Sequence, residues 1–291
     1  MIALTIGLAV FVGVALGLLG GGGSILTVPL LAYVAGMDAK QAIATSLLVV
    51  GVTSAIGAIS HARAGRVQWR TGLIFGGAGM AGAFGGGLLA RFIPGTVLLI
   101  GFAVMMVATA VAMLRGRKNV EVTDGSHRLP VPKIVAEGLI VGLVTGLVGA
   151  GGGFLVVPAL ALLGGLPMPI AVGTSLIVIA MKSFAGLGGY LSSVQINWTV
   201  ALAVTAAAVV GALVGSRLTA KVDPDALRKT FGWFVLAMSS VILAQEIHPS
   251  VGLGAAALTV FAAAMTFVCT RFAHCPLRRL TGAHTSGTAA A

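Results

Sequence analysis

Residues 17–29 read Gly-Leu-Leu-Gly-Gly-Gly-Gly-Ser-Ile-Leu-Thr-Val-Pro, and residues 146–158 read Gly-Leu-Val-Gly-Ala-Gly-Gly-Gly-Phe-Leu-Val-Val-Pro. Both stretches belong to one gapless alignment, in which residues 17–69 match residues 146–198 at a constant offset of 129 positions. Of the 53 aligned positions, 19 are identical. A gapless match of this length indicates an internal duplication, so the chain is predicted to contain two repeats.

The composition predicts that both repeats lie in a membrane. Of the 291 residues, 58% are hydrophobic and only 9% are charged, and the mean hydropathy is +1.08. Soluble domains carry roughly 25% charged residues, so we expect the lipid bilayer to be the surroundings of this chain. The run 2–19 resembles a signal-peptide core, but no charge precedes it and further spans follow, so it is interpreted as the first membrane segment. The net charge of +11 is concentrated in short loops, where it sets orientation, and no nucleic-acid partner is expected.

Each repeat contains five apolar segments, which predicts an all-α polytopic membrane protein. We divide the chain into a first membrane repeat (1–114), a cytoplasmic linker (115–133), a second repeat (134–245), an extra transmembrane helix (246–271) and a tail (272–291). The segments are at about 2–19, 24–35, 42–60, 71–90 and 95–114, then 134–149, 153–164, 170–190, 199–219 and 227–244, with the extra one at 250–270.

The loop charges change sides between the repeats. The loop 61–70 is basic, whereas its equivalent at 190–199 carries no charged residue. The turn near Arg91 has one charge, whereas its equivalent at 217–229 holds four basic residues. Because positive loops stay inside, we expect the linker and C-terminus to be cytoplasmic and the N-terminus outside, in a cell inner membrane. The pattern predicts an inverted repeat of the kind that secondary transporters use. The basic residues concerned are Arg63, Arg66, Arg70, Arg217, Lys221, Arg228 and Lys229.

The second segment of each repeat is too short to cross a bilayer. It has about 12 residues, whereas a crossing helix needs ~20, and it follows consecutive glycines that each cost ~1 kcal/mol in a helix. We therefore expect glycine-broken half-helices, shaped by Pro29 and Pro158, whose free N–H groups line a cavity. The N-terminus of a half-helix suits an anion. The residues expected to bind it here are Gly21, Gly22, Gly23, Ser24, Ala150, Gly151, Gly152 and Gly153.

The glycine runs allow other interpretations. A flexible linker is not expected inside apolar sequence, and a phosphate loop would need Gly-Lys-Ser or Gly-Lys-Thr, which neither stretch has. A dinucleotide fingerprint would need a βαβ unit, which a chain of this kind lacks. The alternative that the glycines only allow close helix packing stays open.

Polar residues within the apolar segments complete the candidate site. Equivalent Thr-Ser pairs, Thr45-Ser46 and Thr174-Ser175, could donate to an anion, or could bond their own helix carbonyls. Lys182 lies in the middle of a segment, where a charge is costly and usually functional, although snorkelling or a structural partner is the alternative. Its repeat equivalent is Thr53. His61, Arg91 and Arg217 lie near segment ends and are interpreted as gate or interface residues.

The acidic residues all lie in loops or near segment ends, which argues against a cation carrier, a metal carrier or a typical proton relay. The apolar segments contain no nucleophile–base pair and no cluster of metal-ligand types, so we predict no catalytic residue, no metal, no cofactor and no enzymatic activity. Cys269 and Cys275, on either side of His274, are interpreted as incidental thiols. The acidic residues are Asp38, Glu121, Asp124, Glu137, Asp223, Asp225 and Glu246.

The two glycine-rich stretches resemble the signature of the sulfite exporter TauE/SafE family. Each is followed by an Ala-x-Ala/Gly-Thr-Ser-Leu motif, at Ala42–Leu47 and Ala171–Leu176, and the resemblance extends from about residue 1 to residue 270. It implies a bacterial-type inner-membrane permease that moves sulfite, sulfonates such as sulfoacetate or taurine-related compounds, or thiosulfate, usually outward. Lys182 is not part of that signature, so its role depends on the physical argument alone.

Taken together, the residues and the resemblance predict a secondary transporter that exports a small sulfur oxyanion by alternating access. The substrate would be sulfite, sulfoacetate or a related organosulfonate. A permease for another anion or a metal ion, an anion pore, and a membrane scaffold that transports nothing are the alternatives. The choice of oxyanion, the direction, the coupling ion and the oligomeric state, including a homodimer, stay open from sequence.

Overall fold

A computed structural model describes residues 2–19, 22–114, 131–149, 151–158, 160, 168–218, 224–247 and 254–257. All regular secondary structure in these residues is helical, and five helices are long and apolar enough to cross a membrane. The prediction of an all-helical, multi-pass membrane protein is confirmed. Most of the linker 115–133, most of the segment 250–270 and all of the tail lie outside the described residues. The five candidate spans are Ala39–Arg63, Trp69–Phe92, Gly95–Ala112, Ile170–Leu191 and Trp198–Leu218.

The helices follow the expected apolar segments closely. In the first sequence repeat they are α1 (Ile2–Leu19), the short series η1 (Gly22–Leu26), α2 (Thr27–Pro29) and η2 (Leu30–Val34), then α3 (Ala39–Arg63), α4 (Trp69–Leu89), η3 (Ala90–Phe92) and α5 (Gly95–Leu114). In the second they are α6 (Val131–Val148), α7 (Gly153–Pro158), α8 (Met168–Leu191), α9 (Trp198–Leu218) and α10 (Pro224–Glu246).

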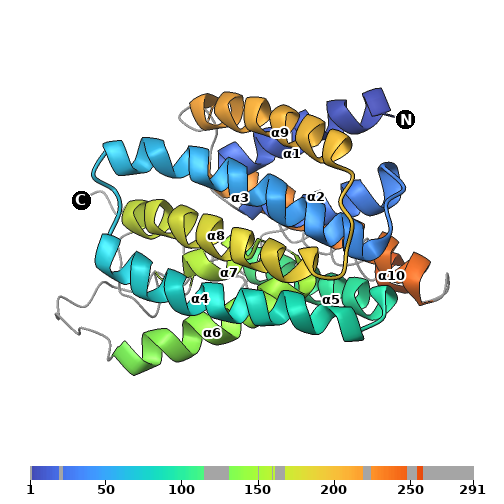
Figure 1. The fold of residues 1–291 in the computed structure, drawn as a ribbon. Helices are drawn as coiled ribbons and strands as arrows, with labels where there is room; N and C mark the ends of the chain where they lie inside the picture. Colours follow the sequence, from blue (N-terminus) through green and yellow to red (C-terminus); the bar gives the residue numbers. More distant parts are fainter. Residues whose placement is uncertain are drawn as a thin grey trace, which may run out of the picture.

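The equivalent helices α3 and α8 pack against each other in opposite directions. Just after α3, the backbone N–H of Gln68 donates to Oγ1 of Thr174 near the start of α8, at 3.0 Å. At the other end, Nε2 of Gln41 near the start of α3 donates to the carbonyl of Gln195 beyond α8, at 3.2 Å. Figure 1 shows the two helices side by side, with the α3–α4 connection and the α8–α9 connection at opposite ends of the molecule.

Two outer helix pairs are held together by glycines. A Cβ added at Gly13 of α1 would collide with the carbonyl of Ala208 on α9, so these backbones touch. The equivalent Gly142 of α6 meets the carbonyl of Gly79 on α4 in the same way. Each contact becomes the other when 129 is added to one residue and subtracted from its partner. The same relation joins Gly17–Ala212 with Gly146–Ala83, Gly211–Val10 with Gly82–Leu139, and Gly215–Val14 with Gly86–Leu143.

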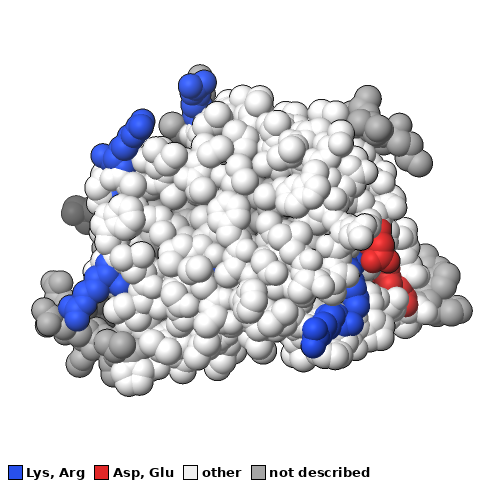
Figure 2. All heavy atoms as spheres, viewed as in Figure 1, with Lys and Arg blue, Asp and Glu red and all other residues white. Residues whose placement is uncertain are grey.

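The surface matches a membrane protein. Large apolar side chains are exposed over most of the helices, for example Phe11 at 57% and Ile140 at 64%. Figure 2 shows the Lys and Arg side chains of this face gathered at its two ends, with a wide uncharged band between them. Exposed tryptophans, Trp69 and Trp198, begin α4 and α9. Because tryptophan favours the membrane–water interface, each marks the entry of its helix into the apolar region.

Candidate functional site

The helical path of the second repeat is interrupted directly after α6. Gly149, Gly151 and Gly152 have φ angles of +72°, +59° and +65°, which L side chains rarely adopt. The chain then enters α7 at Gly153. A Cβ at Gly151 would lie 3.4 Å from the Cβ of Ser24 in η1. The two glycine-rich stretches of the sequence therefore lie against each other, although they are far apart along the chain.

The side chain of Lys182 reaches this interruption from α8. It is 1% exposed, and its Nζ donates to Oγ1 of Thr145 on α6 at 3.1 Å. A Cβ at Gly152 would collide with the same Nζ, so this nitrogen lies directly against the glycine turn. Among the residues that the structure describes, Lys182 has no carboxylate partner. An ammonium has three donors, and Thr145 accepts from one of them.

The predicted Thr-Ser pairs are placed differently in the two repeats. Ser46 donates to the carbonyl of Gly149 at 2.7 Å, which ties α3 to the glycine turn, and Oγ1 of Thr45 is buried without a partner in the described part of the chain. Ser175, in contrast, donates to Val172 in its own helix. Thr174 accepts from Gln68, which follows α3 and is separated from Thr45 by most of the length of that helix.

The remaining predicted residues lie in or beside the short helices of the two repeats, or outside the described residues. Pro29 is the last residue of α2, is buried, and is followed directly by η2 in a continuous helical series. Gly22 and Gly23 begin η1, and Gly153 begins α7 and is buried. Pro158 ends α7. Gly21 and Ala150 lie outside the described residues.

Further hydroxyls at the crossing of α3 and α8 were missed by the sequence reasoning. Ser54 and Ser183 are equivalent in the two repeats, are 2% and 0% exposed, and have no hydrogen-bond partner within the described chain. A Cβ at Gly51 would lie 3.4 Å from the Cβ of Ser183, which places this serine at the α3–α8 contact. The signal that could have identified them is the duplication itself, which preserves both serines.

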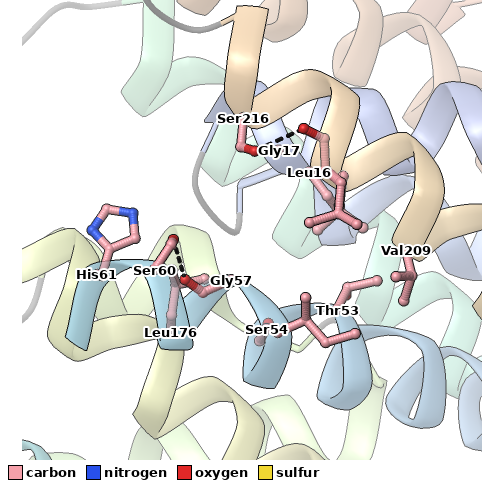
Figure 3. Close-up of a pocket in the computed structure, with 13 residues that line it drawn as sticks. Leu16, Gly17, Thr53, Ser54, Gly57, Ser60, His61, Leu176, Val209 and Ser216 are labelled. Carbon is pink, nitrogen blue, oxygen red and sulfur yellow. Dashed lines mark hydrogen bonds between the residues drawn. The ribbon is translucent and has the colours of Figure 1, made fainter. Parts of the chain in front are cut away.

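A pocket of about 120 Å³ lies between α1, α3, α8 and α9. Figure 3 shows α3 and α9 facing each other across it, with Thr53, Ser54 and His61 on one side and Ser216 on the other. Nδ1 of His61 is buried without a partner among the described residues. A pocket of this volume holds a few waters or one small solute. His61 and Ser216 lie close in sequence to Arg63 and Arg217, so the pocket reaches the basic end of the molecule.

The chain was compared with known protein families and proteins. The family model described as "Sulfite exporter TauE/SafE" matches residues 5–242, which is most of the chain. The chain belongs to the sulfite exporter TauE/SafE family. The family resemblance seen in the glycine-rich stretches is therefore confirmed.

Relatives of this TauE/SafE protein carry a consistent description. It is 35% identical to a probable membrane transporter protein of Xylella fastidiosa (strain Temecula1), over 82% of this chain and 94% of the relative. It is 28% identical to the probable membrane transporter protein YdhB of Bacillus subtilis, over 79% of this chain and 95% of the relative. No solved structure matches it. This TauE/SafE protein is a membrane transporter, as its homologues are named.

Proposed function

We propose that this TauE/SafE transporter exports a small sulfur oxyanion, such as sulfite, sulfoacetate or a related organosulfonate. The observation that carries the proposal is the buried side-chain nitrogen of Lys182, which lies against the turn at Gly152 and has Thr145 as its hydrogen-bond partner. A buried charge without a counter-charge is costly, and an anion arriving beside it removes that cost. A cation at the same place would be repelled.

Buried hydroxyls on α3 and α8 support an oxyanion in particular. The hydroxyls of Thr45, Ser54 and Ser183 are buried without partners in the described chain. An oxyanion has several acceptor oxygens and can take hydrogen bonds from hydroxyls, an ammonium and backbone N–H groups at once. The glycine turn at 149–152 supplies backbone without side chains in front of it, which lets a small anion approach closely. We infer that the interrupted segments are half-helices whose free N–H groups complete this site.

Alternating access requires two arrangements of similar energy, and we propose that two inverted repeats provide them. The opposite directions of α3 and α8 support this proposal. The glycine contacts give further support. Each contact between α1 and α9 has an equivalent between α6 and α4, so the two repeats pack against each other through the same positions.

The basic loops indicate the orientation of the protein in the membrane, and the membrane potential indicates the direction of anion transport. Arg63, Arg66, Arg70 and Arg217 lie at one end of the helices, which the positive-inside rule assigns to the cytoplasm. The N-terminus is then outside, the C-terminus is cytoplasmic, and the His61 pocket faces the cytoplasm. In a cell inner membrane that is negative inside by ~100 mV, an anion gains about 2.3 kcal/mol per charge on leaving. Export therefore needs no proton coupling, and a transport rate that requires a proton gradient at zero membrane potential would contradict this uniport mechanism.

Substrate binding can be tested on the purified protein in detergent. The melting temperature is recorded with sulfite, sulfoacetate, taurine, sulfate, chloride or cobalt, because a ligand that binds the folded state raises it. We expect sulfite or an organosulfonate to stabilise the protein selectively, and Lys182→Ala to reduce that shift. Lys133→Ala, at an exposed lysine at the start of α6, is the matched control and should keep the full shift. Stabilisation by cobalt alone, or by nothing in the panel, would overturn the proposed substrate class.

A further inference from the structure

The pocket beside His61 and the surroundings of Lys182 are equivalent positions in the two repeats. Adding 129 to Leu16, Thr53 and His61 of the pocket gives Thr145, Lys182 and Tyr190. The same location between the helices is thus open in one half of the molecule and occupied by side chains in the other.

On the open side, the side chains leave the space free. Thr53 is short and donates to the carbonyl of Val49 in its own helix at 2.8 Å. On the other side, Lys182 extends to Thr145, and Tyr190 is fully buried and donates to the carbonyl of Leu147. These two side chains fill the location that corresponds to the pocket.

The helix backbones differ between the two sides as well. A Cβ at Gly87 of α4 would lie 2.6 Å from the carbonyl oxygen of Gly186 on α8, so these backbones touch. A Cβ at Gly189 would come equally close to the carbonyl of Phe84. The equivalents of Gly87 and Gly189 are Ser216 and Ser60, and both line the open pocket. The α4–α8 side is therefore closed where the α9–α3 side is open.

We propose that Lys182 is the plug of a second access pocket, between α4, α6 and α8, which opens at the opposite end from the His61 pocket. When α4 separates from α8, the Lys182 side chain moves from the interior to the pocket wall. There its ammonium selects a small oxyanion on the exit side, whereas the equivalent position on the entry side is Thr53. This inference depends on the proposed alternating access and adds to it the residue that closes and then lines the exit.

Matched reporters make the proposal testable. Ser54 lines the open pocket and Ser183 is its buried equivalent, and neither hydroxyl has a partner in the described chain, so Ser54→Cys and Ser183→Cys are mild, comparable changes. Each is placed in a chain with Cys269→Ser and Cys275→Ser, and a membrane-impermeant methanethiosulfonate is added to vesicles of either orientation. Labelling is measured by mass spectrometry.

With Lys182 present, we expect Ser54→Cys to react from the side of the arginine-rich loops and Ser183→Cys to be protected from both sides. Lys182→Thr should raise the labelling of Ser183→Cys at least about tenfold from the opposite side. Lys182→Met keeps most of the length of the side chain without its charge, and should leave Ser183→Cys protected. The exchange Thr53→Lys with Lys182→Thr should reverse the pattern, protecting Ser54→Cys and exposing Ser183→Cys.

Continued protection of Ser183→Cys in Lys182→Thr, at an unchanged melting temperature, would overturn the proposal. Equal labelling in the Lys182→Met and Lys182→Thr variants would overturn it too, because filling of the space would then not be what closes the pocket. Failure of the proposed substrate gives a different result, since the labelling pattern would be as expected while vesicles with the unsubstituted chain would not transport sulfite.

Discussion

The hydroxyl of Ser46, on α3, donates a hydrogen bond of 2.7 Å to the carbonyl of Gly149, in the glycine turn of the other sequence repeat. Both groups are buried, and the same hydroxyl also lies 2.9 Å from the carbonyl of Ile43. The bond therefore holds the turn in place from a helix that is distant in sequence.

Removing this hydroxyl should destabilise the protein. Ser46→Ala leaves the buried carbonyl of Gly149 without its donor, which costs about 1–3 kcal/mol of stability. Ser175→Ala is the matched control, because that equivalent serine bonds only the carbonyl of Val172 in its own helix in the described chain. We expect the melting temperature in detergent to fall clearly for the first variant and little for the second. Equal falls would show that the contact with Gly149 contributes nothing.

The glycine turn should not tolerate a side chain. In Gly152→Ala the added Cβ meets both Nζ of Lys182 and the side chain of Thr145, at a φ of +65°. We expect loss of transport and a lower melting temperature. Gly77→Ala provides the comparison, since nothing lies within 4 Å of its added Cβ and alanine favours a helix by ~1 kcal/mol over glycine. Full transport by Gly152→Ala vesicles would rule out a tight site at this turn.

The paired glycine contacts predict equal sensitivity in the two halves. Gly13→Ala and Gly142→Ala each push a Cβ into a backbone carbonyl, of Ala208 and Gly79 respectively. Because the contacts are equivalent, both should lower the melting temperature by a similar amount. Gly7→Ala lies on the same helix as Gly13 with nothing within 4 Å of its added Cβ, and should be neutral. A large effect in one half alone would contradict the equivalence of the α1–α9 and α4–α6 contacts.

The orientation of the two connecting loops can be measured directly. Arg66 and Gln195 are equivalent, exposed residues in the α3–α4 and α8–α9 connections. In inverted repeats, Arg66→Cys should react with an impermeant maleimide from the cytoplasmic side and Gln195→Cys from the outside. Reaction of both from the same side would exclude inversion, whatever the substrate.

The sequence predicted the helices well because their signal is local and repeated. The expected segment 42–60 became α3, Ala39–Arg63, and the expected 170–190 became α8, Met168–Leu191. The length of an apolar segment and the duplicated glycines are visible in the sequence, so recognising them requires no knowledge of tertiary contacts.

The partners of individual side chains could not be predicted in this way. Thr45 and Thr174 are equivalent in the two repeats, yet one has a free hydroxyl in the described chain and the other accepts from Gln68. The difference arises from which helix comes near each end, a property of the assembled bundle. Likewise, the mid-segment position of Lys182 indicated function, but its contact with Thr145 depends on the rotation of α6 against α8.

The pairing of α1 with α9 and of α4 with α6 has a consequence for biogenesis. During synthesis, the first half of the chain enters the bilayer before either of these partner helices exists. The glycine-lined faces of α1 and α4 must then wait, covered by lipid or by the insertion machinery, until α6 and α9 emerge. Neither half completes its own packing, so the two halves must fold together. A chain that ends at the linker would lack the partner helices of both α1 and α4.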